Sequence, residues 1–165
     1  MFPFDRLIRL MDDWAANTKA DDLFCQIGTG AFVPRNMKFV RALSQADFSK
    51  TVAAAEIVVA HAGMGTVITA GSFGRPLVLL PRRHEWGEHT TDHQIATANW
   101  LRGKPGVFIA DTDDDLGPAI AEARRVAGAG GGMERIPPVA DAIFTSRLRQ
   151  ALDEFLRDPK TKAGK

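Results

Sequence analysis

Short apolar runs alternate with amphipathic segments along the whole chain. Five of these runs, each bounded by glycine, proline or charged residues, predict β-strands at residues 23–27, 37–40, 56–61, 76–81 and 106–110. The last three are continuously apolar at their centres. That pattern is typical of strands buried on both faces of a parallel sheet.

Segments with helical periodicity fill the intervals between the strands. They predict helices at residues 3–17, 46–55 (with Ser44 as a cap), 64–73, 88–101, 114–127 and 146–156. The last of these carries Leu148, Leu152, Phe155 and Leu156 on one face. Strands that alternate with helices of this length predict a Rossmann-like, doubly wound parallel α/β sheet. Such sheets usually begin with a strand, whereas this chain begins on a helix.

Composition narrows the class of protein. A length of 165 residues with 45% hydrophobic and 25% charged residues indicates one globular domain over 1–165, with a flexible segment at 128–138 and a frayed tail at 158–165. A net charge of +1 argues against a protein dedicated to nucleic acid. The single Cys25 favours a reducing compartment. Because the start is unlike a signal peptide and no apolar stretch is long enough to span a bilayer, we expect a cytoplasmic protein.

A glycine-rich turn follows the strand predicted at 56–61. In open α/β sheets, ligands bind at the carboxyl ends of strands, where Gly63 and Gly65 let backbone approach closely, Thr66 offers a hydroxyl and the next helix presents its N–H groups. The turn lacks a P-loop lysine and the full dinucleotide fingerprint, so an ordinary tight turn is the alternative. The turn Gly28-Thr29-Gly30 is a weaker candidate of the same kind.

Histidines and carboxylates gather between residues 82 and 94. His89 and His93 are four residues apart on the predicted helix and therefore share a face. This spacing suits zinc, but only two ligands are clearly placed, and a zinc site needs at least three protein ligands. Asp92, His93 and Gln94 also suit sugar hydroxyls, because carboxylate and amide groups supply hydrogen-bond acceptors and donors. A solvated helix start is the remaining alternative.

Four segments together resemble a known family. PFDRLIRLMDDWA (3–15), QIGTGAF (26–32), the glycine-turn region (53–83) and GEHTTDHQIATA (87–98) are similar to the glycosyltransferase family 28 C-terminal domain. Within it, the chain resembles stand-alone bacterial exopolysaccharide subunits and the catalytic subunit of the eukaryotic two-part enzyme that adds the second GlcNAc to dolichol-linked sugar. The resemblance extends from residue 3 to about residue 156.

The resemblance implies one half of a GT-B enzyme, inverting and without a cofactor or metal, that binds a UDP-sugar as donor. His61, Gly63, Gly65 and Thr66 would surround the diphosphate and ribose. Glu88, His89, Asp92 and Gln94 would face the sugar. The full set of candidate donor-binding residues is His61, Gly63, Met64, Gly65, Thr66, Thr69, Arg82, Glu88, His89, Asp92, His93 and Gln94.

Two departures from the family pattern stand out. Larger members carry a ribose-binding Glu at the position of Thr69, which can make one hydrogen bond but not a bidentate pair. The family's opening strand and its Gly-Thr turn, expected before residue 3, are absent from the sequence. A misplaced start, a truncation or a true loss would each explain this, and the first two are favoured because losing a central strand exposes two edges.

The leading hypothesis is a UDP-sugar-binding subunit of a two-component glycosyltransferase. A membrane-associated, acceptor-binding partner subunit would supply a lipid-linked sugar acceptor and the general base, and would recruit the chain to the cytoplasmic face of the membrane. GlcNAc, glucose and glucuronic acid all remain open as the donor sugar. The alternatives are a non-catalytic nucleotide-sugar-binding or scaffold module and, more remotely, a zinc hydrolase.

Overall fold

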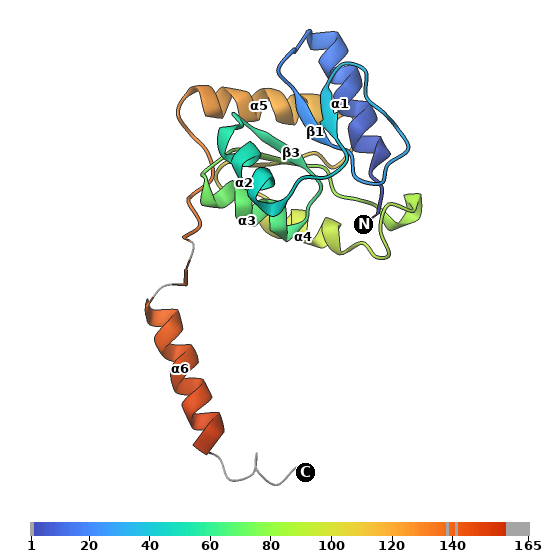
Figure 1. Ribbon diagram of the computed structural model, residues 1–165. Coiled ribbons are helices and arrows are strands. Elements are labelled where there is room, and N and C mark those ends of the chain that lie inside the picture. Colours follow the sequence, from blue (N-terminus) through green and yellow to red (C-terminus); the bar gives the residue numbers. More distant parts are fainter. Residues whose placement is uncertain (1, 138, 141, 158–165) are drawn as a thin grey trace.

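A computed structural model of the chain describes residues 2–137, 139–140 and 142–157 (Figure 1). Its helices are α1 (Asp5–Thr18), α2 (Gln45–Ala54), α3 (Met64–Ser72), α4 (His93–Leu101), α5 (Leu116–Gly128) and α6 (Ala142–Arg157), with a 3₁₀ helix η1 (His84–Trp86). Its strands are β1 (Phe24–Gln26), β2 (Lys38–Val40), β3 (Val58–Ala60), β4 (Leu77–Leu79) and β5 (Val107–Ile109). Each strand lies inside a run that the sequence predicts.

The strands form two parallel sheets, ordered β1-β2 and β3-β4-β5. Val59 lies opposite Val78, and Val78 opposite Phe108, so β4 is the middle strand of the larger sheet. Within the described residues β1 pairs only with β2, and β3 only with β4, which leaves one edge of each unpaired. The parallel α/β architecture predicted from the sequence is confirmed, although the strands form two separate sheets.

Helices cover both faces of the larger sheet, and β4 separates two clusters of core residues. Val78 and Leu80 pack in a cluster with α1 and α5, whereas Leu77 and Leu79 pack in a second cluster with α2, α3 and α4. All four side chains are fully buried, and burying each stabilises the fold by about 1.5–3 kcal/mol. This explains the continuously apolar sequence of the strand: both of its faces lie in the core.

Helix α1 connects the two sheets. Leu7 and Met11 on its inner face belong to the core cluster that also contains Val78 of β4. On the other side, the Asp12 carboxylate accepts hydrogen bonds from the backbone N–H groups of Arg35 and Asn36, at 2.9 and 2.7 Å, in the loop that leads into β2. The smaller sheet is therefore held in place by α1.

The prediction that a helix starts at residue 88 is wrong, because α4 starts at His93. The chain instead makes η1, turns at Gly87 with a left-handed φ of 68°, and begins α4 only at His93. Side chains hold this turn open, because Glu88 Oε2 accepts from the Arg83 N–H at 2.9 Å and Asp92 Oδ1 from the His84 N–H at 2.9 Å. Short polar side chains that bond to nearby backbone compete in this way with helix formation.

The glycine-rich segment predicted to be flexible packs partly against the sheet domain. Ile136 donates its backbone N–H to Gly71 O at 3.1 Å, and its side chain fills the space beside that glycine. Gly106, at a φ of +71°, has the backbone of Gly132 where a Cβ would lie. The predicted tail at 158–165 lies outside the described residues.

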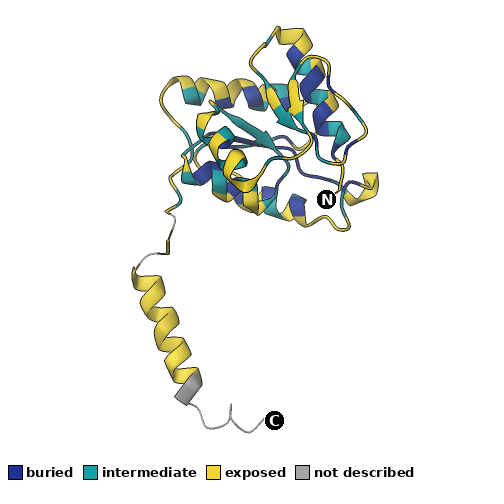
Figure 2. Ribbon diagram, viewed as in Figure 1, coloured by how far each residue is buried: buried dark blue, intermediate teal, exposed yellow. Residues whose placement is uncertain are grey.

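Helix α6 stands apart from both sheets (Figures 1 and 2). It begins four residues earlier than the sequence predicts, and its side chains from 142 to 155 are exposed. None of the described helices combines the length and the apolar character needed to cross a bilayer.

Candidate functional site

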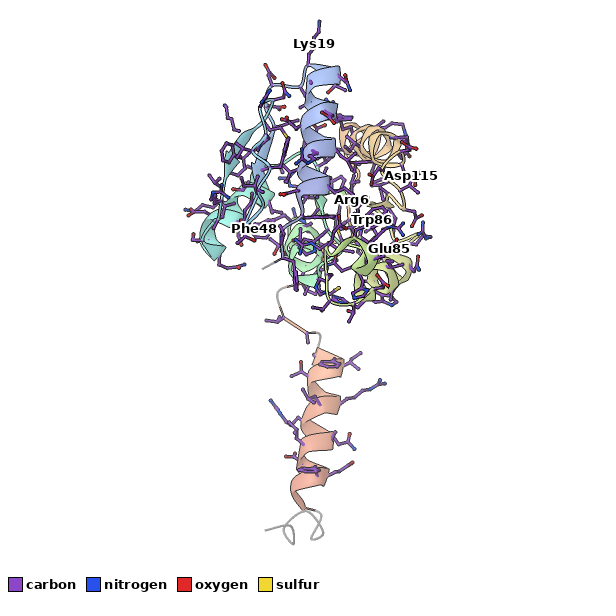
Figure 3. All side chains as sticks on the ribbon, turned by 90° about the vertical axis from the view of Figure 1, so that its right-hand side faces the viewer. Arg6, Lys19, Phe48, Glu85, Trp86 and Asp115 are labelled. Atoms are coloured by element: carbon purple, nitrogen blue, oxygen red, sulfur yellow. The ribbon has the colours of Figure 1, made fainter. Side chains whose placement is uncertain are left out.

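The candidate residues meet where β3, β4 and β5 end. Because the three strands are parallel, their carboxyl ends lie at one edge of the sheet. Residues 61–63 follow β3 and lead into α3, residues 80–92 follow β4, and residues 110–115 follow β5. Figure 3 shows that Arg6, Trp86 and Glu85 also lie at this end of the molecule, at the opposite end of α1 from Lys19.

The N-terminus of α3 forms one wall of the site. In its first turn the N–H groups of Thr66 and Val67 bond to Gly63 O, at 3.1 and 3.2 Å, while those of Met64 and Gly65 have no partner in the part of the chain that the structure describes. Gly65 has no atom within 4 Å of the position of a Cβ, so space is open beside it. Unsatisfied N–H groups at the positive end of a helix dipole attract an anion.

His61 lies directly behind this turn and is held neutral. Burial lowers the pKa of His61, and the nearby charge of Arg82 lowers it further. A side-chain hydrogen bond with Gln94 opposes these effects, and the pKa is about 4. Its Nδ1 is buried without a hydrogen-bond partner in the described residues. A Cβ at Gly63 would overlap the imidazole, so this glycine is required by close packing. At neutral pH, His61 can therefore donate or accept a hydrogen bond but carries no charge.

Arg82 brings a buried positive charge to the same edge. Only 7% of the residue is exposed, yet its guanidinium makes no ion pair within the described residues and its Nε is without a hydrogen-bond partner. It lies over the Phe4 ring, 5.0 Å from the centroid. Burial lowers the pKa of Arg82, and the negative charge of Glu88 opposes that shift. A buried cation without a contacting counter-ion is costly, so an anion bound here would be strongly stabilised.

Gln94 hydrogen-bonds to both Arg82 and His61. It is 3% exposed, and its Oε1 accepts the backbone N–H of Arg82 at 3.2 Å. Asp92 bonds to the His84 backbone, as described above, so its carboxylate stabilises the loop. Direct contact of either residue with a sugar stays a prediction, while their contacts with the loop after β4 are part of the structure.

Glu88 is fully engaged by other residues. Its carboxylate receives Arg6 Nε at 2.7 Å and Arg6 Nη2 at 2.8 Å, in addition to the Arg83 N–H. Arg6 also donates to Asp113 Oδ1 at 2.7 Å and to Pro81 O at 2.9 Å. Burial lowers the pKa of Arg6, but the hydrogen bonds to Glu88 and Asp113 outweigh it and the pKa lies above its usual value. The predicted role of Glu88 at the sugar remains untested, and its contacts assign it a loop-fixing role.

Sequence reasoning missed Arg6 and Phe4. Arg6 is 82 positions from Glu88, and nothing in the local pattern of either residue predicts their contact. Phe4 is 7% exposed and meets the His61 ring edge-on, with centroids 6.5 Å apart. The signal that could have found them is the segment PFDRL itself, one of the four that carry the family resemblance.

His89 and His93 are close, but not as the sequence predicts. Because α4 begins at His93, the two do not share a helical face, and their rings instead meet edge-on at 4.4 Å between centroids. Desolvation lowers the pKa of His89, and the positive charges of His93 and Arg82 lower it further. Their Nδ1 atoms already contact Thr90 and Thr91. Among the described residues, no group of three or more His, Cys, Asp or Glu is placed to hold a metal ion.

The turn Gly28-Thr29-Gly30 has a different setting from the turn before α3. No helix follows it in the described segment 28–37, so it offers no helix N-terminus. The carboxylate of Asp5 lies against Gly30 and accepts the Ala31 N–H at 3.0 Å. Arg41 donates to the carbonyl groups of both glycines. These contacts tie the turn to α1.

Thr69 lies on α3 behind the glycine turn. Its hydroxyl donates to Gly65 O at 2.8 Å, within its own helix. A ligand would therefore have to compete with this hydrogen bond for the hydroxyl proton, although the oxygen can still accept.

Most of the chain matches one protein family. Residues 3–104 match the glycosyltransferase family 28 C-terminal domain, a stretch that includes β3, β4 and every candidate donor-binding residue. The match also contains Phe4 and Arg6.

Two curated relatives are bacterial transferases, both named UDP-N-acetylglucosamine--N-acetylmuramyl-(pentapeptide) pyrophosphoryl-undecaprenol N-acetylglucosamine transferase. The one from Cutibacterium acnes (strain DSM 16379 / KPA171202) is 31% identical over 80 residues, which are 48% of this chain and 20% of that protein. The one from Sorangium cellulosum (strain So ce56) is 30% identical over 122 residues, 71% of this chain and 29% of that protein. The chain thus spans less than a third of either relative. It belongs to the glycosyltransferase family 28 C-terminal domains.

Proposed function

We propose that the chain binds the UDP-sugar donor of an inverting, two-component glycosyltransferase. The observation that carries this proposal is the buried guanidinium of Arg82, which has no contacting counter-ion in the described residues, at the sheet edge that also holds the α3 N-terminus. A diphosphate would supply two negative charges to a site that holds the Arg82 guanidinium and, within the described residues, the unpartnered N–H groups of Met64 and Gly65. The UDP-sugar named in both relatives supports this choice of ligand.

The proposed role of the site residues follows from the negative charge that develops on the departing UDP. In an inverting transfer, an acceptor hydroxyl attacks the anomeric carbon, the bond from that carbon to the UDP oxygen breaks, and the electron pair leaves with UDP. Arg82 and the N–H groups of Met64 and Gly65 would stabilise the departing diphosphate, a form of electrostatic catalysis that needs no further reorganisation. Neutral His61 would add a hydrogen bond without competing charge. The general base that takes the acceptor proton would lie on the partner.

The partner supplies the acceptor in this proposal. Both relatives are named for a lipid-linked acceptor and are more than three times as long as the part that this chain matches. A membrane-associated, acceptor-binding subunit would complete the enzyme and bring the chain to the cytoplasmic face of the membrane. GlcNAc is the first donor sugar to test, with glucose and glucuronic acid as alternatives.

Calorimetric titration tests the donor site directly. We expect UDP and UDP-sugars to bind, uridine to bind far more weakly, and Arg82→Met to weaken UDP binding at least about tenfold, because a charged hydrogen bond is lost. Arg125→Met is the matched control, since Arg125 is an exposed arginine of α5 that pairs with Glu122. Equal affinity of the wild type and Arg82→Met for UDP would refute the proposal.

A non-catalytic nucleotide-sugar-binding module is the second candidate. It is favoured by Thr69, whose hydroxyl is bonded within α3 where larger family members carry a ribose-binding Glu. Sugar transfer by the chain mixed with its acceptor-binding partner distinguishes the two. Transfer that falls with Arg82→Met supports an enzyme, whereas donor binding without any transfer supports the module.

A further inference from the structure

The apolar side chains of α6 gather in one sector of the helix. With about 100° of rotation per residue, Phe144, Leu148, Ala151, Leu152 and Phe155 fall within a sector roughly 100° wide. Leu148 and Leu152 are 49% and 52% exposed, and both phenylalanines are more than half exposed. Figure 2 shows this helix exposed wherever its burial is described, from residue 142 to residue 155.

Charged residues are ordered around this sector. Arg147 and Arg149 flank it on its two sides, and Asp153 lies on the opposite face of the helix. Glu154 lies beside Arg147 and accepts a hydrogen bond from Gln150 Nε2 at 3.0 Å. The arginines therefore lie at the boundary between the apolar and polar faces.

The charge of the C-terminal part differs from that of the rest of the chain. Residues 142–165 carry six basic and three acidic residues, of which α6 itself contains three basic and two acidic, although the whole chain has a net charge of only +1. An amphipathic helix with aromatic and leucine side chains on one face and basic residues at its margins suits the surface of an anionic membrane.

We propose that α6 binds flat on an anionic lipid surface. Its apolar sector would enter the boundary between headgroups and acyl chains, and Arg147 and Arg149 would contact lipid phosphates. The helix is too short and too polar to cross the bilayer. At 16 residues it also spans only about two heptads, short of the three or four that indicate a coiled coil with a second copy.

The proposal goes beyond donor binding. It gives the chain its own contact with the membrane, independent of any partner subunit. Arg82 and the α3 N-terminus take no part in it, so vesicle binding and UDP binding can be measured separately.

Vesicle co-sedimentation of the full chain tests the proposal. We expect binding to phosphatidylcholine vesicles that contain about one third phosphatidylglycerol, and at least about tenfold weaker binding to phosphatidylcholine alone. The double variant Leu148→Ser, Leu152→Ser should lose more than about tenfold in partitioning, because several buried CH₂ groups are removed. Ile143→Ser is the matched control, since Ile143 lies on the same helix outside the apolar sector.

A second pair of substitutions tests the charges. Arg147→Gln with Arg149→Gln should weaken binding to anionic vesicles roughly thirtyfold and leave binding to neutral vesicles unchanged. Both double variants should bind UDP as the wild type does, which shows that they fold.

Several results would overturn the proposal. One is failure of the wild type to bind anionic vesicles. Another is equal loss of binding in Ile143→Ser and in the leucine variant. A third is a dimer that depends on Leu148 and Leu152 and ignores vesicles, which would assign this face to a second copy of the chain.

Discussion

At the carboxyl edge of the larger sheet, the arginine on one side has carboxylate partners, whereas the arginine on the other side has none in the described residues. On the side of α1, Arg6 has a bidentate carboxylate, a second carboxylate and a carbonyl as partners. On the side of α3, Arg82 is more deeply buried than Arg6 and has no ion pair in the described part of the chain. The first arrangement is complete without a ligand. The second would be completed by an anion, which is how the structural half of the edge can be told from the binding half.

The Arg6 half should give the largest loss of stability. In Arg6→Met, Glu88 is left with only the Arg83 N–H, and the free energy of unfolding should fall by about 3 kcal/mol because a buried charge loses its partner. Chemical denaturation measures this. Arg125→Met, which breaks an exposed pair that solvent screens, should change the free energy of unfolding far less. Equal losses in the two variants would mean that the Arg6 network is no stronger than a surface pair.

His61 should make the binding half sensitive to acid. Its pKa is about 4 in the folded chain against 6.5 for an ordinary histidine, so the unfolded chain binds more protons between these values. The free energy of unfolding should therefore fall as the pH drops from 6.5 towards 4, with His61 contributing about 2 kcal/mol of the loss. In His61→Asn this contribution should vanish. A difference between wild type and variant that is the same at both ends of the range would contradict the assignment.

Arg82→Met should change the free energy of unfolding in the opposite direction from Arg6→Met. Without nucleotide, removing an uncompensated buried charge should raise the free energy of unfolding by about 1 kcal/mol. The rise in Tm that UDP gives the wild type should be lost in this variant. Thermal melts with and without UDP check both statements. Destabilisation as large as that of Arg6→Met would show that Arg82 has a structural partner.

Gly65→Ala should have the smallest effect on the fold. No atom lies within 4 Å of the new Cβ, so the unfolding free energy should change by only a few tenths of a kcal/mol, towards greater stability because alanine favours helix. UDP binding should nevertheless weaken if the diphosphate lies against this backbone. Unchanged UDP affinity in this stable variant would place the ligand elsewhere on α3.

The sequence predicts what local periodicity controls. The five strands and the start of α3 at Met64 follow from apolar runs and glycine turns, and Ser44 caps α2 as expected by accepting the Asp47 N–H at 3.1 Å. The start of α4 does not follow, because Glu88 is held by a residue 82 positions away rather than by its helical neighbours. The two glycine turns look alike in sequence, but a helix follows only the turn at Gly63, and Asp5 and Arg41 hydrogen-bond to residues 28–31 of the other turn.

Burial at the site was equally hard to predict. The sequence predicts Gln94 at a donor sugar, with a solvated helix start as the alternative, and neither predicts that Gln94 is only 3% exposed. Its depth depends on how α4 packs under the loop after β4, which no local pattern contains. The candidate donor-binding residues were named from the sequence, whereas the fold was needed to show which of them, such as Glu88 and Asp92, hold the loop after β4.

Within the described residues, each of the outer strands β1, β2, β3 and β5 has an unpaired edge, which has a practical consequence for handling the chain. Backbone N–H and C=O groups along such edges can pair with strands of another molecule, which is a common route to aggregation. Phe24 on β1 is 43% exposed and adds apolar surface beside one of these edges. The purified chain should therefore self-associate as its concentration rises, and any extended segment that pairs with one of these edges should reduce this and improve its solubility.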